Sequence, residues 1–202
     1  MGGKSGGNEA AQARADEQAR QDKIRAGTER VNGIFDENFN DDFFTGRREA
    51  FLDYSKPQLE TQYDDAQKEL TFSLARGGNL NSSVRGQKVG ELQRLYDTQS
   101  KSIADQALAE ETQARNAVQD ARGSLISTLN ATGDAEGAAS SALARSAALS
   151  QPSAYSPLGQ LFTDFTSGLG TQAAAERSFA AGGPAPKYNT GLFGGGRVVT
   201  RS

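Results

Sequence analysis

The segment from Ser83 to Asn130 constrains the fold most, because it is rich in Gln and Ala and contains no proline. Three glycines, Gly86, Gly90 and Gly123, weaken a helix here without interrupting it. As one α-helix the segment would be about 70 Å long. A helix of that length extends far beyond any globular core that this chain could fill. The segment therefore predicts a long helix that needs neighbouring helices to cover it.

The supply of large apolar side chains supports the same conclusion. Only 36% of the 202 residues are hydrophobic, and alanine makes up much of that fraction. Leu, Ile, Val and Phe together lie near the level at which a chain struggles to offset its conformational entropy alone. We therefore expect a small isolated core and a structure that is ordered mainly on oligomerisation.

A stripe of apolar residues before the long helix predicts its packing partner. Ser55-Lys56-Pro57 reads as a helix start, with Ser55 as N-cap and Pro57 in the first turn. Apolar residues then recur every three or four positions up to a break at Gly77, a candidate C-cap. We therefore expect this helix to pair with the long helix as an antiparallel hairpin. Long amphipathic helices would then form an elongated all-α fold. The residues expected to pack helices or oligomers are Leu59, Tyr63, Leu70, Leu74, Leu92, Tyr96 and Ile103.

The remaining segments suggest a division into residues 1–30, 31–150 and 151–202. Residues 1–7 form a Gly-rich leader, and Asn8 is a candidate N-cap for a polar Ala/Gln helix ending near Gly27. This helix has almost nothing to bury and is marginal alone. Residues 31–150 hold the helical hairpin or bundle. Within it, Gly133 is a candidate C-cap and Asp134 a candidate N-cap of a short helix to about Leu149.

Three phenylalanines stand out before the hairpin. The spacing of Phe35, Phe39 and Phe43 places their rings on one face of a helix. They could anchor the top of the hairpin, or they could form a docking patch for a partner protein. Both interpretations remain open from the sequence.

Residues 151–202 are rich in Gly, Ser, Pro and Ala and predict a largely extended tail. Its last segment is basic, with Lys187, Arg197 and Arg201 and no acidic residue. The segment could be solvated and disordered. It could also be a docking peptide, in which Val198 and Val199 add a strand to the sheet edge of a partner.

The residue types present predict neither an enzyme nor a cofactor or metal site. The chain has no cysteine and no histidine, so it lacks thiolate ligands, the commonest metal ligand and the usual proton-transfer group. Its net charge of −3 argues against a dedicated nucleic-acid binder. Paired acids such as Asp64-Asp65 would diverge on a helix face instead of meeting across a cleft. No apolar run is long enough to span a bilayer, and we expect a cytosolically made, soluble chain without a signal peptide.

In its layout and short motifs the chain resembles the small DNA-ejection (internal virion) proteins of short-tailed bacteriophages, the podoviruses. The motifs are the leader 2–4, the helix 10–25, the segments 51–59 and 74–83, the helix end 129–134 and the final 197–199. The resemblance implies storage in the capsid near the portal, release through the tail, and assembly with other proteins into a conduit for genome DNA across the host envelope. It implies a ring-like homo-oligomer, portal, tail or other ejection proteins as partners, passage of DNA without sequence-specific binding, and contact with the host envelope.

Three other functions fit the same residues. A static portal or head–tail junction protein would share the helices and stay in the virion. A cellular helical adaptor or scaffold would have a cytosolic partner and no capsid. A lytic murein hydrolase is the enzymatic alternative, although no catalytic motif supports it.

Overall fold

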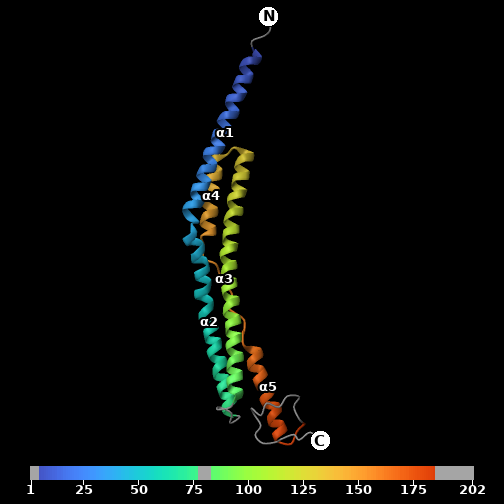
Figure 1. Ribbon diagram of the computed structural model, residues 1–202. Coiled ribbons are helices and arrows are strands. Elements are labelled where there is room, and N and C mark those ends of the chain that lie inside the picture. Colours follow the sequence, from blue (N-terminus) through green and yellow to red (C-terminus); the bar gives the residue numbers. More distant parts are fainter. Residues whose placement is uncertain (1–4, 77–82, 185–202) are drawn as a thin grey trace. The chain divides into compact units, whose positions relative to one another are not determined.

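The computed structural model describes residues 5–76 and 83–184 (Figure 1). Every regular element in these ranges is a helix, which confirms the all-α fold class for this part of the chain. The five helices are α1 (Ser5–Asn38), α2 (Asp41–Arg76), α3 (Ser83–Thr132), α4 (Ala135–Leu149) and α5 (Thr163–Ala180). The expected cap at Gly77, residues 1–4 of the leader and the end of the tail from residue 185 lie outside the described residues.

The chain forms two compact units, and each is built from two separate stretches of sequence. Unit 1 contains residues 1–50 and 107–154, and unit 2 contains residues 51–106 and 155–202. Helices α2 and α3 therefore each contribute to both units. The expected division at residues 30 and 150 stays a prediction.

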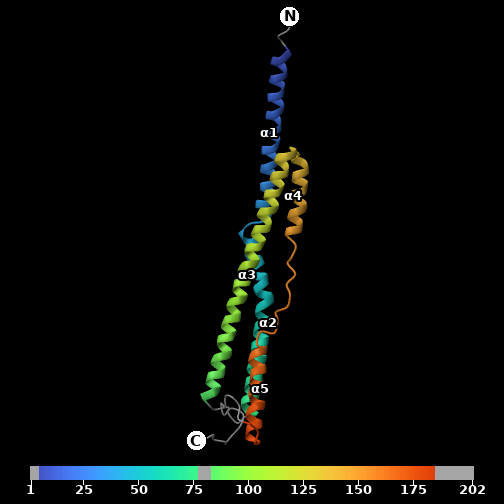
Figure 2. The same ribbon diagram turned by 90° about the vertical axis from the view of Figure 1, so that its right-hand side faces the viewer.

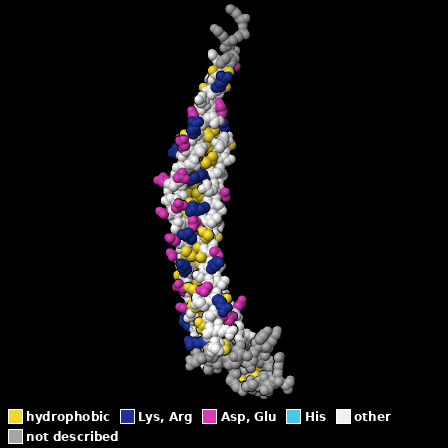
Figure 3. All heavy atoms as spheres, in the orientation of Figure 1, with side chains coloured by type: hydrophobic (Ala, Val, Ile, Leu, Met, Phe, Trp, Pro, Cys, Tyr) yellow, Lys and Arg dark blue, Asp and Glu magenta, His cyan; other side chains and the backbone are white. Residues whose placement is uncertain are grey.

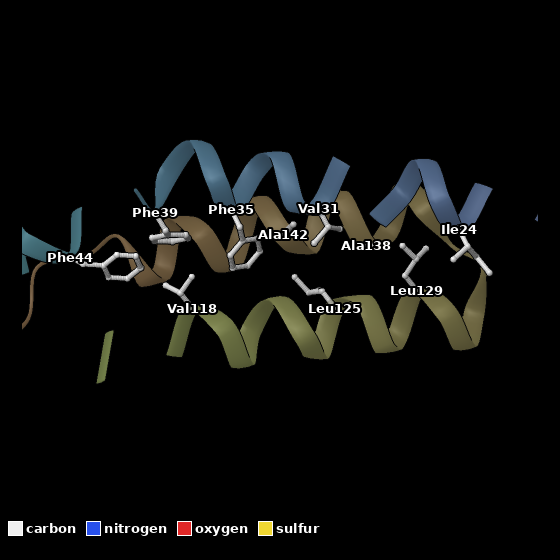
Figure 4. Packing of buried hydrophobic residues seen from close by; sticks show 10 residues of the cluster. All are labelled: Ile24, Val31, Phe35, Phe39, Phe44, Val118, Leu125, Leu129, Ala138 and Ala142. Carbon is white, nitrogen blue, oxygen red and sulfur yellow. The ribbon is translucent and has the colours of Figure 1, made fainter. Parts of the chain in front are cut away.

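In unit 1, α1, α4 and the second part of α3 lie side by side in both ribbon views (Figures 1 and 2). Their facing side chains form one apolar cluster (Figure 4). Helix α1 contributes a stripe that continues from Ile24 through Val31 to Phe35, and α3 opposes it with Val118, Leu125 and Leu129. Helix α4 contributes two buried alanines, Ala138 and Ala142, and Ala135 and Leu149 at its ends pack against the cluster while partly buried. Because alanine is small, α4 approaches its neighbours closely and contributes little buried area.

The turn between α3 and α4 was predicted correctly. Gly133 has φ +72°, the left-handed conformation expected of a helix C-cap, and its N–H donates to the carbonyl of Leu129 at 2.7 Å. The carboxylate of Asp134 then accepts a hydrogen bond from the N–H of Gly137 at 2.9 Å. The predicted helix end near Leu149 is also confirmed.

The expected end of the first helix near Gly27 is wrong. Helix α1 starts before Asn8 and continues through Gly27 to Asn38. Gly27 is buried at the point where α1 passes α4: a Cβ there would lie 2.9 Å from the Cβ of Ala135. This glycine serves close packing between helices and does not end one.

In unit 2, the first part of α3 runs antiparallel to the second part of α2, as expected of a hairpin (Figure 1). The rings of Tyr63 and Tyr96 lie 4.5 Å apart between centroids, and the Tyr63 hydroxyl donates to Gln93 at 2.7 Å. The buried aliphatic side chains of the two helices are Leu59, Leu70, Leu74, Leu92 and Ile103.

The predicted helix start at Ser55 and Pro57 is wrong, because α2 runs without a break from Asp41 to Arg76. Ser55 is fully buried, and its hydroxyl has no hydrogen-bond partner in the described part of the chain. Phe51 and Leu59 are buried on either side of Pro57. Packing of these two side chains outweighs the single backbone hydrogen bond that the proline cannot donate.

Within the segment expected to be a largely extended tail, residues 163–180 form α5. Phe165, Leu169 and Ala173 are buried at intervals of four residues, the spacing of one helix face. Gly168 and Gly170 obscured this pattern in the sequence, since glycine lowers helix propensity.

Candidate assembly and peptide-binding surfaces

The first part of α1 buries no side chain against the rest of unit 1. Every side chain from residue 8 to residue 23 is exposed, and Ile24 is the first buried one. Arg20 provides the first link to the rest of the unit, donating to the carbonyl of Asn130 at 3.0 Å. Basic and acidic side chains are interspersed along this stretch instead of forming one charged face (Figure 3). Residues 8–23 therefore form an exposed polar helix, and its faces other than that of Arg20 are available to another molecule.

The phenylalanines proposed for docking lie at a corner between α1 and α2. Helix α1 ends at Asn38 and α2 starts at Asp41, so Phe35, Phe39 and Phe43 do not share one continuous helix. Their rings nevertheless contact each other in order, with centroids 5.5 and 4.9 Å apart. Phe35 and Phe39 are buried in the core of unit 1. In this unit the rings act as an anchor, and Phe35 and Phe39 present no exposed docking patch.

Asn40 sets the position of this corner. Its side-chain oxygen accepts a hydrogen bond from the N–H of Phe43 at 3.0 Å, which caps the start of α2. Asp41 and Asp42 follow in the first turn, where the helix dipole favours negative charge. An Asn followed by two Asp is a recognisable N-cap pattern, so the sequence carried a signal for this corner.

Arginines lie over the phenylalanine rings around the corner. The guanidinium of Arg115 is 4.3 Å from the ring centroid of Phe44, and that of Arg122 is 5.6 Å from that of Phe35. Both arginines project from α3 and pair with acids on either side of the corner, Arg115 with Asp41 at 3.2 Å and Arg122 with Asp36. Arg115 also pairs with Glu111 on its own helix, and the hydrogen bond that Arg115 donates to Glu111 raises the pKa of Arg115 above its ordinary value. These contacts hold α1 and α2 to α3 at the corner.

The predicted helix-packing residues are placed within unit 2. Leu59, Leu70, Leu74, Leu92 and Ile103 are buried there. Tyr63 and Tyr96 are partly buried and contact each other. They pack helix against helix inside one chain, and their role between copies stays a prediction. Val198 and Val199 lie outside the described residues.

An extended segment before α5 is bound to α2 by two glutamines, which the sequence reading missed. Gln58 accepts a hydrogen bond from the N–H of Leu158 at 3.0 Å. Gln62 accepts from the N–H of Leu161 at 2.8 Å and donates to the carbonyl of Gly159 at 3.0 Å. Because both glutamines bind main-chain groups, this face of α2 holds an extended peptide with little dependence on its side chains.

A groove of about 540 Å³ lies next to this bound segment, between α2 and the first turns of α5. We call it the α2–α5 groove. It is lined by Gln62, Asp65, Ala66, Glu69, Gln160, Phe162, Thr163, Thr166 and Ser167. All of these residues belong to unit 2.

The described residues contain no group of three or more His, Cys, Asp or Glu side chains placed to hold a metal ion. Over the same residues, no helix is both long and apolar enough to cross a membrane. Comparison with family models, curated proteins and solved structures finds no match to this chain.

Proposed function

We propose that this chain is a non-enzymatic structural protein of the virion of a short-tailed bacteriophage, released through the tail to help form a conduit for genome DNA across the host envelope. The observation that carries the assembly role is the polar helix 8–23 of α1, which buries none of its side chains in its own unit. The phage context comes from the resemblance of the layout and short motifs to podoviral ejection proteins.

An isolated polar helix such as residues 8–23 of α1 has weak stability of its own. Most helical stability in proteins comes from packing an apolar face, and a lone stretch of this length is marginal in water. A helix that is polar all round typically bridges other elements. Neighbouring copies arranged in a ring would supply the missing contacts through repeated equivalent interfaces. Portal, tail or other ejection proteins are the partners of such a ring.

Single large apolar side chains on the surface give further positions for contacts between chains. Phe72, Val89, Leu108 and Leu143 are each more than two-fifths exposed. Scattered exposed apolar residues are normal on a monomer, so they support the proposal only together with the unpartnered helix.

The charge of the chain suits passage of DNA without sequence-specific binding. The chain has a net charge of −3, and its basic side chains are interspersed with acidic ones. Such a surface supplies little of the phosphate neutralisation on which tight DNA binding depends. A conduit that held DNA tightly would obstruct its movement. In this proposal the protein resides in the capsid near the portal, or in the tail, and in the host envelope after release.

The fate of the protein on infection tests the ejection role. Protein mass spectrometry of purified particles, before and after receptor-triggered DNA release, should detect the chain before release and lose it afterwards. Presence in both samples would identify a fixed portal or head–tail junction protein. Absence from both would leave a cellular helical adaptor and overturn the virion role.

The assembly role has its own test. Ala11 and Ala15 are exposed on α1, so the pair of changes Ala11→Glu and Ala15→Glu should leave unit 1 folded and weaken self-association. The matched control introduces the same changes at Ala50 on α2 and Ala131 on α3, which are exposed in unit 1 and lie away from the exposed apolar positions named above. Light scattering coupled to size-exclusion chromatography should show a loss of oligomers for the α1 pair only. Equal oligomerisation of both variants would contradict the role of α1.

A further inference from the structure

We propose that the α2–α5 groove is the binding site of the chain's own basic segment, residues 185–202, which lies outside the described residues. This inference does not depend on the proposed phage function. It rests on the chemistry of the groove, on the charge of the segment and on the length of chain that joins them.

The groove lining offers mainly hydrogen-bond acceptors. The hydroxyl of Thr163 already donates to Gln160 at 2.9 Å, and that of Thr166 donates to the carbonyl of Phe162 at 3.2 Å. Asp65 and Glu69 add two carboxylates. Asp65 already pairs with Lys68 at 3.0 Å, with both side chains about two-thirds exposed, whereas Glu69 makes no hydrogen bond or ion pair with the described residues. A ligand rich in donors and positive charge matches this lining.

The groove also continues a face of α2 that already binds an extended peptide. Gln58 and Gln62 hold residues 158–161 through main-chain hydrogen bonds. Asp65 and Glu69 follow Gln62 at helical intervals and face the groove. A second extended segment could therefore lie along α2 beyond the first, with its basic side chains next to the two carboxylates.

Residues 185–202 have the matching chemistry. They contain Lys187, Arg197 and Arg201 and no acidic residue. Val198 and Val199 follow Arg197 directly, and Ala66 and Phe162 give the groove an apolar part of its lining. An arginine at the carboxylates would thus bring the two valines to the apolar lining.

The connecting chain is long enough for this contact. Helix α5 has 18 residues, so the distance from its end back to its first turns is about 27 Å. Residues 185–197 span up to about 43 Å when extended. The segment reaches the groove of its own chain, and no second copy is required.

Trypsin cleavage after Arg197 in the folded, full-length chain tests the proposal. A free peptide of residues 185–202 gives the rate for an unbound segment. In the intact chain we expect cleavage at least about fivefold slower, a factor that two exposed ion pairs can supply. The double variant Asp65→Asn and Glu69→Gln should cleave at a rate close to that of the free peptide. Circular dichroism confirms that each variant remains helical.

The matched control removes the same two charges elsewhere on α2, by Asp53→Asn and Glu60→Gln. Both residues are exposed and lie outside the groove lining. This control variant should be cleaved as slowly as the original chain. In about 1 M salt the original chain should lose its protection and be cleaved as fast as the free peptide. Cleavage of the intact chain as fast as the peptide, or equal rates for both double variants, would overturn the proposal. Protection that depends on protein concentration would assign the groove to another copy's segment and overturn binding within one chain.

Discussion

Gly27 and Gly33 offer a direct test of how α1 packs in unit 1. Both glycines lie on α1, so changing either to alanine improves helix propensity by the same amount, about 1 kcal/mol. Their surroundings differ. A Cβ at Gly27 would lie 2.9 Å from both the Cβ of Ala135 and a methyl of Leu129, and 3.2 Å from the Cα of Ala135. A Cβ at Gly33 would meet nothing within 4 Å.

The expected effects on stability therefore differ in sign. Gly33→Ala should stabilise the chain by about 0.5–1 kcal/mol through helix propensity. Gly27→Ala gains the same term, but the added methyl must push α4 or a leucine aside, at a cost of about 1–3 kcal/mol. Because the propensity term cancels between the two variants, their difference isolates the packing cost.

Urea unfolding followed by far-ultraviolet circular dichroism gives the free energy of each variant. The two units can unfold separately, so amide hydrogen exchange within α1 and α4 should accompany the measurement. We expect Gly27→Ala to lie about 1–3 kcal/mol below Gly33→Ala, with the loss of protection confined to unit 1. Equal stability of the two variants would show that α1 does not pass α4 at the close distance described.

Four other measurements probe the remaining elements. Pro57→Ala should raise the unfolding free energy by about 1–3 kcal/mol in urea titrations, because proline costs about 3 kcal/mol inside a helix and recovers part of it by restricting the unfolded chain. Asn40→Ala should lower it by about 1 kcal/mol through loss of the α2 cap, and no change would contradict that cap. Phe35→Ala should cost about 3–5 kcal/mol or unfold unit 1, whereas Phe72→Ala, at an exposed ring, should stay within about 0.5 kcal/mol. Calorimetry of the monomer should find unfolding below about 60 °C, and a cooperative transition above it would contradict the dependence on assembly.

Local signals and apolar spacing predicted much of the fold. Gly133 ends α3 by bonding to Leu129, and Asp134 caps α4 by bonding to Gly137, so residues within four positions place that turn. The spacing of apolar residues in α2 and α3 likewise predicted that the two helices pair in unit 2. The wrong predictions share the opposite property. Local grounds favoured a helix end at Gly27 and a helix start at Pro57. Gly27 lies inside α1 because Leu129 and Ala135, distant in the sequence, pack against it, and Pro57 lies inside α2 between the buried side chains of Phe51 and Leu59.

The candidate surfaces also divide into those set by local sequence and those set by contacts with distant residues. The exposure of residues 8–23 was foreseeable, since a stretch without large apolar side chains has nothing to bury. The burial of Phe35 and Phe39 was not decided by the sequence, because an aromatic face suits a core and a docking patch equally well. The glutamine contacts were hidden for a further reason: Gln58 and Gln62 bind main-chain atoms about a hundred residues away, so no side-chain pattern marks them. Sites that bind backbone leave little trace in composition, and in this chain such a site adjoins the groove to which we assign residues 185–202.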